Sequence, residues 1–179
     1  MAKNKGLGIP VLYNTSSYET VESLQTLDGL VDIYLPDLKY MSSALSGRYS
    51  FAKDYTEIAK KAISEMMRQT GPATFNKDGL ITKGTIVRHL VLPGSSMDSK
   101  HIIRYLHETY GNDIYISIMN QYTPMRDVAD HPQLGRKVPQ WEYKKIVDYA
   151  IEIGVENGFV QEAASSDVNF IPKFDGTGV

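Results

Sequence analysis

The sequence of 179 residues contains no cysteine. Disulfides, thiolate nucleophiles and cysteine-held metal clusters are therefore excluded from this chain. The formal net charge is only -2 and the basic residues form no run, so nothing favours binding to nucleic acid through its phosphates. No apolar stretch approaches the roughly 18 residues that span a bilayer, and no apolar segment of a signal peptide follows the N-terminal lysines. We expect a soluble, cytoplasmic protein without a membrane or nucleic-acid partner.

Apolar runs and amphipathic segments alternate along the chain. The runs predict strands at residues 9–15, 31–35, 85–92 and 114–119, and the amphipathic segments predict helices at 20–27, 55–70, 96–110 and 140–153. Strands that alternate with helices indicate βα units with parallel pairing. Because a closed (β/α) barrel needs eight units, the predicted fold is α/β, a partial (β/α) barrel of about four parallel βα units.

The segments between these elements contain turn-forming and polar residues. Residues 41–50 are expected to be a linker, 72–84 a hairpin-like excursion around the turn at 76–79, and 120–139 a long loop that is a candidate for function. Residues 159–179 mix Ser, Asn, Pro and Gly and are expected to be mostly irregular. We therefore predict one domain over residues 1–158, followed by a C-terminal tail over residues 159–179.

Polar side chains occur near the end of every predicted strand. They are Asn14, Thr15 and Ser16; Asp37 and Lys39; Arg88; and Asn120 and Gln121. Because side chains alternate along a strand, Val31, Ile33 and Leu35 should share a face with Asp37 and Lys39. The carboxyl ends of barrel strands form the rim that carries active sites. Lys39 and Arg88 could bind a carboxylate or phosphate there, although a lone Asp-x-Lys is also typical of a surface ion pair.

Other candidate groups carry weaker signals. None of the four histidines has metal-ligand spacing, and His89 is expected to face the core as a structural residue. No Ser/His/Asp arrangement is apparent. The turn Gly94-Ser95-Ser96 precedes a predicted helix and could present its amides to an anion.

Four phrases of the sequence together resemble the second half of a radical S-adenosylmethionine (SAM) protein, most closely the pyruvate formate-lyase activating enzyme-like group. They are Val11–Glu19, Val31–Tyr40, Ile86–Gly94 and Ile114–Pro124, and Phe170–Asp175 is similar as well. The resemblance implies a partial (β/α)6 barrel whose first half holds a [4Fe-4S] cluster on three cysteines. In that family the cluster binds SAM and one electron cleaves it, yielding a 5′-deoxyadenosyl radical that removes a hydrogen atom. In activating enzymes the hydrogen comes from a glycine of a partner enzyme.

The resemblance also implies site residues. Asn14 and Thr15 match an acidic-Thr pair, although an Asp is typical where Asn14 stands, which weakens the expectation of a monovalent cation beside SAM. Asp37 and Lys39 match an Asp-x-Lys, Arg88 matches an Arg that contacts SAM, and Gln121 with Tyr122 matches loosely a nucleotide-contacting segment. The expected cofactor-binding residues are Asn14, Thr15, Ser16, Asp37, Lys39, Arg88 and Gln121, with no catalytic or metal-binding residue in this chain.

The sequence departs from the family where the cluster would be bound. It has no cysteine and no Gly-Gly-Glu segment for the SAM amino group. We therefore expect the C-terminal, SAM-contacting half of a longer protein, inactive alone, with SAM as cofactor and the [4Fe-4S] cluster held in the parent only. Expected partners are the missing N-terminal half, a second copy paired through exposed strand edges, and a glycyl-radical enzyme for the parent. Two alternatives stay open: a non-catalytic interaction or ligand-binding module, and a lyase that uses Lys39 as a Schiff-base amine.

Overall fold

The computed structural model describes residues 6–124, 130–162 and 165–169. In chain order the elements are β1 (Leu12–Thr15), α1 (Val21–Gln25), β2 (Ile33–Pro36), α2 (Ser43–Ser50), α3 (Tyr55–Thr70), β3 (Thr74–Phe75), β4 (Ile81–Leu90), α4 (Ser96–Tyr110), β5 (Tyr115–Met119), the 3-10 helix η2 (Pro132–Gly135), α5 (Gln140–Glu152), β6 (Gly158–Glu162) and β7 (Ser165–Asn169). No helix in these ranges is both long enough and apolar enough to cross a bilayer.

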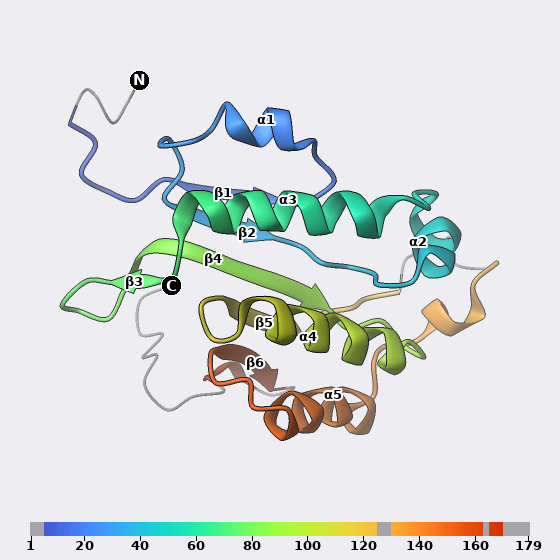
Figure 1. Cartoon of the computed structure of the whole chain (residues 1–179). Coiled ribbons are helices and arrows are strands. Elements are labelled where there is room, and N and C mark those ends of the chain that lie inside the picture. Colours follow the sequence, from blue (N-terminus) through green and yellow to red (C-terminus); the bar gives the residue numbers. More distant parts are fainter. Residues whose placement is uncertain (1–5, 125–129, 163–164, 170–179) are drawn as a thin grey trace.

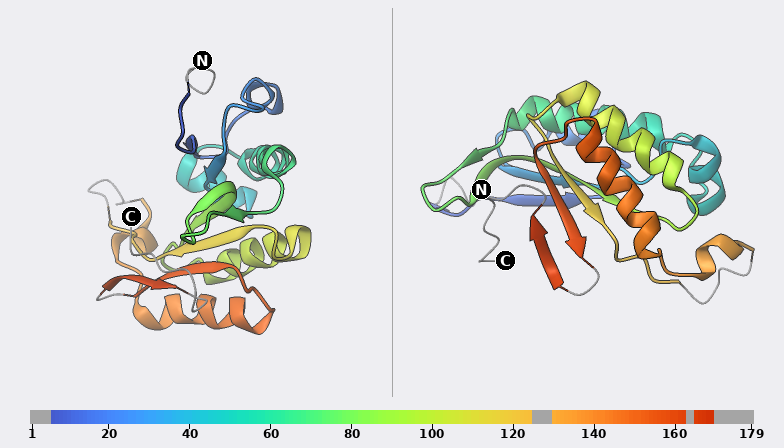
Figure 2. Two further views of the ribbon diagram at one scale, coloured as in Figure 1. Left: turned by 90° about the vertical axis from the view of Figure 1, so that its left-hand side faces the viewer. Right: turned by 90° about the horizontal axis from the view of Figure 1, so that it is seen from below.

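The strands form one sheet in the order β1-β2-β4-β5-β6-β7, and β3 pairs with β4. Neighbours from β1 to β6 are parallel, whereas β3 and β7 are antiparallel to their partners. Helices α1, α3, α4 and α5 lie over one face of this sheet (Figures 1 and 2). The predicted α/β fold is confirmed: the chain is a partial (β/α) barrel of four parallel βα units with a fifth parallel strand after them.

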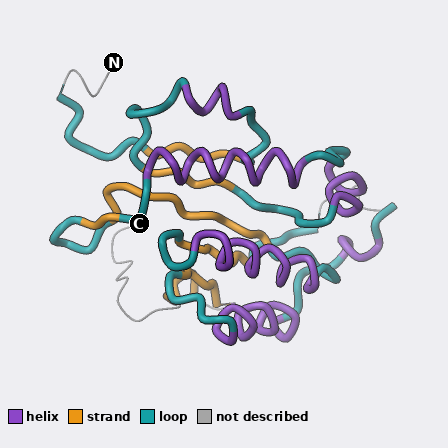
Figure 3. Tube along the Cα trace, viewed as in Figure 1, coloured by secondary structure: helices purple, strands orange, loops and turns teal. Residues whose placement is uncertain are grey.

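Figure 3 shows the helices as a layer beside the strands. The hydrophobic core is formed by side chains of these strands and helices. Val87 and Ile116 from the strands pack with Ile63, Ile102 and Ile146 from α3, α4 and α5, and all five are almost completely buried. A smaller cluster joins β2 to α1 and α3. The opposite face of the sheet is only partly buried, so polar groups on that face remain within reach of a ligand.

Side-chain alternation follows the prediction in β4 but not at the start of β2. His89 points into the core, as predicted, together with Val87, and Arg88 between them lies on the open face. Val31, in contrast, packs in the small core cluster with Tyr34 instead of sharing the open face with Leu35. The prediction for Val31 was wrong because β2 begins only at Ile33, so the alternation does not extend back to residue 31.

Most element predictions agree with the structure, and two segments differ. Residues 43–50, expected as a linker, form α2, in which the Ser42 hydroxyl accepts a hydrogen bond from the amide of Leu45. Residues 158–162 and 165–169 form β6 and β7, so this part of the expected irregular tail is ordered: β6 pairs with β5, and β7 pairs with β6. The rest of the tail, residues 163–164 and 170–179, lies outside the described residues.

Candidate functional site

Arg88 of β4 is the centre of a polar network on the open face of the sheet. Its Nε donates to Asp37 Oδ1 at 2.9 Å, and its Nη2 lies 2.6 Å from the same oxygen. Nη2 also donates to Asn14 Oδ1 at 2.7 Å. These three residues are distant in sequence and meet because β1, β2 and β4 are neighbours in the sheet.

The backbone pairing of the strands sets the geometry of this network. Asp37 forms a bridge with Arg88 just beyond the end of β2, where the Leu38 amide donates to the Arg88 carbonyl at 2.9 Å. On the other side, the Asp37 amide donates to the Thr15 carbonyl at 2.9 Å. Asn14 is in register with Leu35, which is two residues before Asp37. Because residues two apart share a face of the sheet, the Asn14 side chain lies on the same face as Asp37.

Lys39 adds a second cation to the network. Its Nζ lies 3.7 Å from Asp37 Oδ2. The Lys39 side chain is 42% exposed, against 17% for Asp37 and 26% for Arg88. With one carboxylate and two cations the cluster carries a net positive charge, which favours an anionic group on a ligand. The structure therefore brings together four of the predicted residues: Asn14, Asp37, Lys39 and Arg88.

Tyr55, at the start of α3, connects the chain segments that follow β1 and β2 through hydrogen bonds of its hydroxyl group. Sequence reasoning missed this residue. Its hydroxyl accepts from the Lys39 amide at 3.0 Å and lies 2.8 Å from the Asp37 carbonyl and 3.0 Å from the Ser16 carbonyl. Burial raises the pKa of the Tyr55 phenol above its ordinary value, so the hydroxyl stays a donor to these carbonyls. In the sequence it belongs to an apolar helical stripe, and only the choice of Tyr in place of Phe distinguishes it.

Three of the predicted site residues do not join the Arg88 network. The Thr15 hydroxyl is directed to the helical side, where it donates to Glu19, and the Tyr13 hydroxyl donates to the same carboxylate at 2.8 Å. Ser16 contributes its backbone carbonyl to Tyr55. Gln121 is exposed beyond the end of β5 and, in the part of the chain that the structure describes, makes no hydrogen bond to Asn14, Asp37 or Arg88.

Ser17 has a strained backbone beside this site. Its φ is 63°, in the left-handed region that disfavours residues with a Cβ. It is completely buried, and its hydroxyl has no hydrogen-bond partner among the described residues. Its amide donates to the Thr15 hydroxyl at 3.0 Å, which tightens the turn after β1.

The turn before α4 is already filled by a carboxylate of this chain. Glu142 of α5 accepts from the Gly94 amide at 2.5 Å and from the Ser96 hydroxyl at 3.3 Å, and Arg136 Nη2 lies 3.0 Å from its other oxygen. The side chain of Glu142 is only 3% exposed. A carboxylate at a helix N-terminus is stabilised by the helix dipole. The anion suggested by the turn sequence is therefore internal, and this turn is not a free ligand site.

His89 is a structural residue, as predicted. Its Nδ1 lies 2.9 Å from the Leu38 carbonyl and its Nε2 lies 2.9 Å from the Ser99 hydroxyl. Because a carbonyl can only accept, Nδ1 carries the proton and Nε2 accepts from Ser99. Burial lowers the pKa of His89 to about 4, so the ring is neutral near pH 7. Ser99 and His89 are both buried, so this pair fastens α4 to the sheet and does not meet a substrate.

The donor set does not fit an iron–sulfur cluster. The chain has no cysteine, and the described residues contain no group of three acidic or histidine side chains arranged to hold a metal. The charged groups at the rim fit a small zwitterion better, since Lys39 and Arg88 offer donors while Asp37 and Asn14 offer acceptors.

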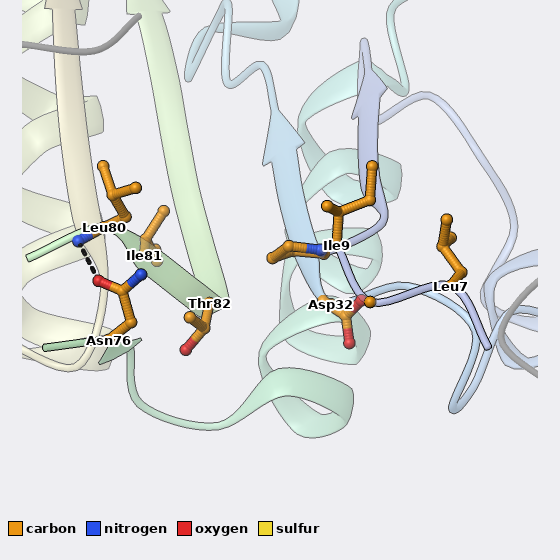
Figure 4. Close-up of a pocket in the computed structure, with 9 residues that line it drawn as sticks. Leu7, Ile9, Asp32, Asn76, Leu80, Ile81 and Thr82 are labelled. Atoms are coloured by element: carbon orange, nitrogen blue, oxygen red, sulfur yellow. Dashed lines mark hydrogen bonds between the residues drawn. The ribbon is translucent and has the colours of Figure 1, made fainter. Parts of the chain in front are cut away.

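A separate cavity of about 550 Å³ lies at the opposite, N-terminal ends of the strands. Figure 4 shows Leu7 and Ile9 on one side of it and Leu80 and Ile81 on the other, with Asp32 at the start of β2. The Asp32 carboxylate accepts from the Val11 amide at 2.7 Å, which fixes the chain as it enters β1. This cavity shares no lining residue with the Arg88 network, so the two are distinct features of the fold.

The chain is similar to a protein of Methanocaldococcus jannaschii named "Uncharacterized protein MJ0674". The two are 28% identical over 144 residues, which cover 79% of this chain and 38% of that protein. The chain thus spans well under half the length of this relative. No protein-family model matches the chain, and no solved structure matches it.

Proposed function

We propose that this chain is the C-terminal, SAM-contacting half of a radical SAM protein of the activating enzyme-like group. The observation that carries the proposal is the joining of Asn14, Asp37 and Arg88 on three neighbouring parallel strands. All three are among the seven residues that the resemblance assigns to the SAM pocket. Their position at the carboxyl ends of the strands is where α/β barrels bind ligands.

The network offers complementary groups to the amino acid part of SAM. A carboxylate could approach Lys39, whose ammonium is the most exposed charge of the cluster, and the outer side of the Arg88 guanidinium. The oxygens of Asp37 and Asn14 could accept from an amino group. Because Asp37 already pairs with Arg88, we expect it to orient the guanidinium as well as to contact the ligand.

The [4Fe-4S] cluster would have to come from outside this chain, because the residues present do not fit it. In the family it supplies the electron that cleaves SAM. The relative supports a longer parent protein, because the matched region is only 38% of the relative and the remaining length could include a cluster-binding half.

Calorimetric titration of the purified chain with SAM tests this proposal. We expect measurable binding that Arg88→Met weakens about tenfold or more, because a lost charge-assisted hydrogen bond corresponds to roughly 1.5–3 kcal/mol. The matched control is Arg68→Met, which removes an ion-paired arginine near the end of α3, away from the network. Circular dichroism of each variant establishes that it is folded. The absence of binding to millimolar SAM, or equal weakening by both substitutions, would overturn the proposal.

A non-catalytic interaction module is the second candidate. The observation that favours it is the free edge of β1, which has one partner strand in the described part of the chain. The Schiff-base alternative has less support, because the Lys39 ammonium pairs with Asp37 at 3.7 Å and an amine must be neutral to attack a carbonyl.

A further inference from the structure

The backbone pairing between β1 and β2 ends where the Arg88 network begins. Its last hydrogen bond runs from the Asp37 amide to the Thr15 carbonyl at 2.9 Å. Among the described residues, no backbone hydrogen bond joins residues 16–18 to residues 38–40. The distance between the two chain segments beyond the strands therefore depends on another contact.

The hydroxyl of Tyr55 supplies that contact. It lies 2.8 Å from the Asp37 carbonyl and 3.0 Å from the Ser16 carbonyl, and it accepts from the Lys39 amide at 3.0 Å. A phenol has one proton to donate and lone pairs that accept, so the two carbonyls share one donor. Because the side chain is only 4% exposed, little water competes for these bonds. The hydroxyl thus fixes the end of β1 against the end of β2.

The start of α3 also holds the strained turn after β1. Tyr18 stacks on Tyr55 with ring centroids 6.0 Å apart, and its hydroxyl donates to Asp54 at 2.7 Å. Ser17, whose φ is 63°, therefore lies between a carbonyl and a ring that are both held by α3. A strained conformation persists only where its surroundings enforce it, and such strain is frequent at functional sites. The turn follows β1 directly, so α3 also fixes the strand end that carries Asn14.

The side chains at these strand ends are the charged and polar groups of the network. Asp37 and Lys39, whose backbone groups bond to Tyr55, supply its carboxylate and its ammonium. The Asp37 carboxylate accepts from Arg88 Nε at 2.9 Å. Because a hydrogen bond is lost beyond about 3.5 Å, a backbone shift of roughly 1 Å at Asp37 would separate these two groups.

We infer that Tyr55 is a positioning residue for the Arg88 network. Its hydroxyl is buried and bonded to three backbone groups, so it acts on a ligand only through the side chains of the network. Removing the hydroxyl releases the strand ends and misaligns Asp37 with Arg88 while the fold is kept. The geometric part of the inference is independent of any ligand, and only its consequence for SAM binding rests on the proposed function.

Tyr143 of α5 provides a matched comparison. Its hydroxyl donates to the Ile118 carbonyl of β5 at 2.7 Å, and its side chain is 3% exposed. Tyr55 and Tyr143 are thus both buried helical tyrosines that bond to backbone carbonyls, but β5 supplies no side chain to the hydrogen bonds and ion pairs of the Arg88 network. An effect seen in Tyr55→Phe and absent from Tyr143→Phe therefore reports positioning and not a general loss of stability.

Hydrogen exchange of the arginine Nε–H groups, followed by NMR on the whole chain, tests the geometry. In the wild type Arg88 Nε is bonded to Asp37. Its exchange should become about tenfold faster in Tyr55→Phe, because the loss of a hydrogen bond changes an equilibrium constant by about that factor. Tyr143→Phe should leave the exchange of Arg88 unchanged.

An internal reference and a second variant complete the experiment. Arg68 Nε donates to a carboxylate of its own helix at 2.8 Å, and its exchange should stay constant in every variant. Tyr18→Phe removes only the exposed bond to Asp54 and loosens the turn without changing a buried group. It should accelerate the exchange of Arg88 about two- to threefold, because an exposed hydrogen bond contributes less. This variant keeps the inference testable even where Tyr55→Phe does not fold.

Calorimetric titration with SAM tests the consequence for binding. Tyr55→Phe should weaken binding about tenfold, and Tyr143→Phe should leave it unchanged. Unchanged exchange of Arg88 in Tyr55→Phe, or equal acceleration in both variants, would overturn the inference and make Tyr55 a purely structural residue. Where Tyr55→Phe does not fold, unchanged exchange in Tyr18→Phe overturns it. A wild-type chain that binds no SAM, while the exchange of Arg88 responds to Tyr55→Phe alone, would refute the proposed function and support the positioning role of Tyr55.

Discussion

Acidification should destabilise this protein through His89. The ring is enclosed between the Leu38 carbonyl and the Ser99 hydroxyl, and burial lowers its pKa to about 4, from 6.5 in an unfolded chain. Since the folded pKa is the lower one, the neutral ring contributes its full stabilisation above pH 6.5. That contribution is lost as the pH falls toward 4, because the unfolded chain takes up a proton that the folded chain excludes.

The magnitude follows from the difference between the two pKa values. Each pKa unit corresponds to about 1.4 kcal/mol, so the complete loss is roughly 3.4 kcal/mol. At pH 5 the unfolded histidine is almost fully protonated while His89 is not, and the loss is about 2 kcal/mol. Against a typical stability of about 5–15 kcal/mol, this is readily measured. Asp98 acts in the opposite direction, because burial raises its pKa and protonation then favours the folded state.

Urea unfolding at pH 7.5 and pH 5 checks this expectation. His89→Gln should be less stable than the wild type at pH 7.5, because it loses the paired ring, yet its stability should fall by about 2 kcal/mol less between the two pH values. The comparison removes the contribution of Asp98, which is present in both proteins. Equal losses in wild type and His89→Gln would refute the reasoning and would mean that the buried ring is reached by solvent or accepts a proton in the folded state.

Three further substitutions have expected effects on the free energy of unfolding in urea. Tyr55→Phe should cost about 1–3 kcal/mol, because the Lys39 amide and the carbonyls beneath the rim lose their shared partner; no measurable loss would show that water replaces the hydroxyl. Ser17→Gly should stabilise by roughly 1 kcal/mol, since relief of the left-handed strain and loss of an unpaired hydroxyl exceed the entropy of glycine; a loss of stability would contradict this. Glu142→Gln should cost about 1–3 kcal/mol, because the Gly94 amide loses a charged acceptor and Arg136 loses its ion-pair partner; a second measurement in high salt should show a smaller difference if the ion pair with Arg136 contributes.

The main elements could be predicted because their signals are local. Residues 85–92 are rich in β-branched side chains, and the turn at 76–79 places Asn76 where its side chain accepts from the amides of Asp78 and Leu80. Helix α2 lacked such a signal, since SALSGRYS has no apolar stripe. Strands β6 and β7 were missed for a related reason. Their sequences contain mainly polar and small residues, and they become strands because β6 pairs with β5 and β7 pairs with β6.

The site shows the same division. Strand-end polarity predicted that Asn14, Asp37, Lys39 and Arg88 would meet, because parallel strands end on one side of the sheet. Thr15 was expected with them, but its position in the register directs it to the helical face. Tyr55 could not be found, because a tyrosine in an apolar stripe has the pattern of a core residue.

The sequence by itself determined the alternation of strands and helices, the open-face position of Arg88 and the exclusion of a cysteine-held cluster from this chain. These depend on residue type and on spacing within one element. Only the tertiary structure decided that Arg88 bonds to both Asp37 and Asn14, and that Glu142 fills the turn at Gly94, 48 positions away. These hydrogen-bond partners depend on strand order and helix packing, because a carboxylate bonds to the donors that the fold places beside it.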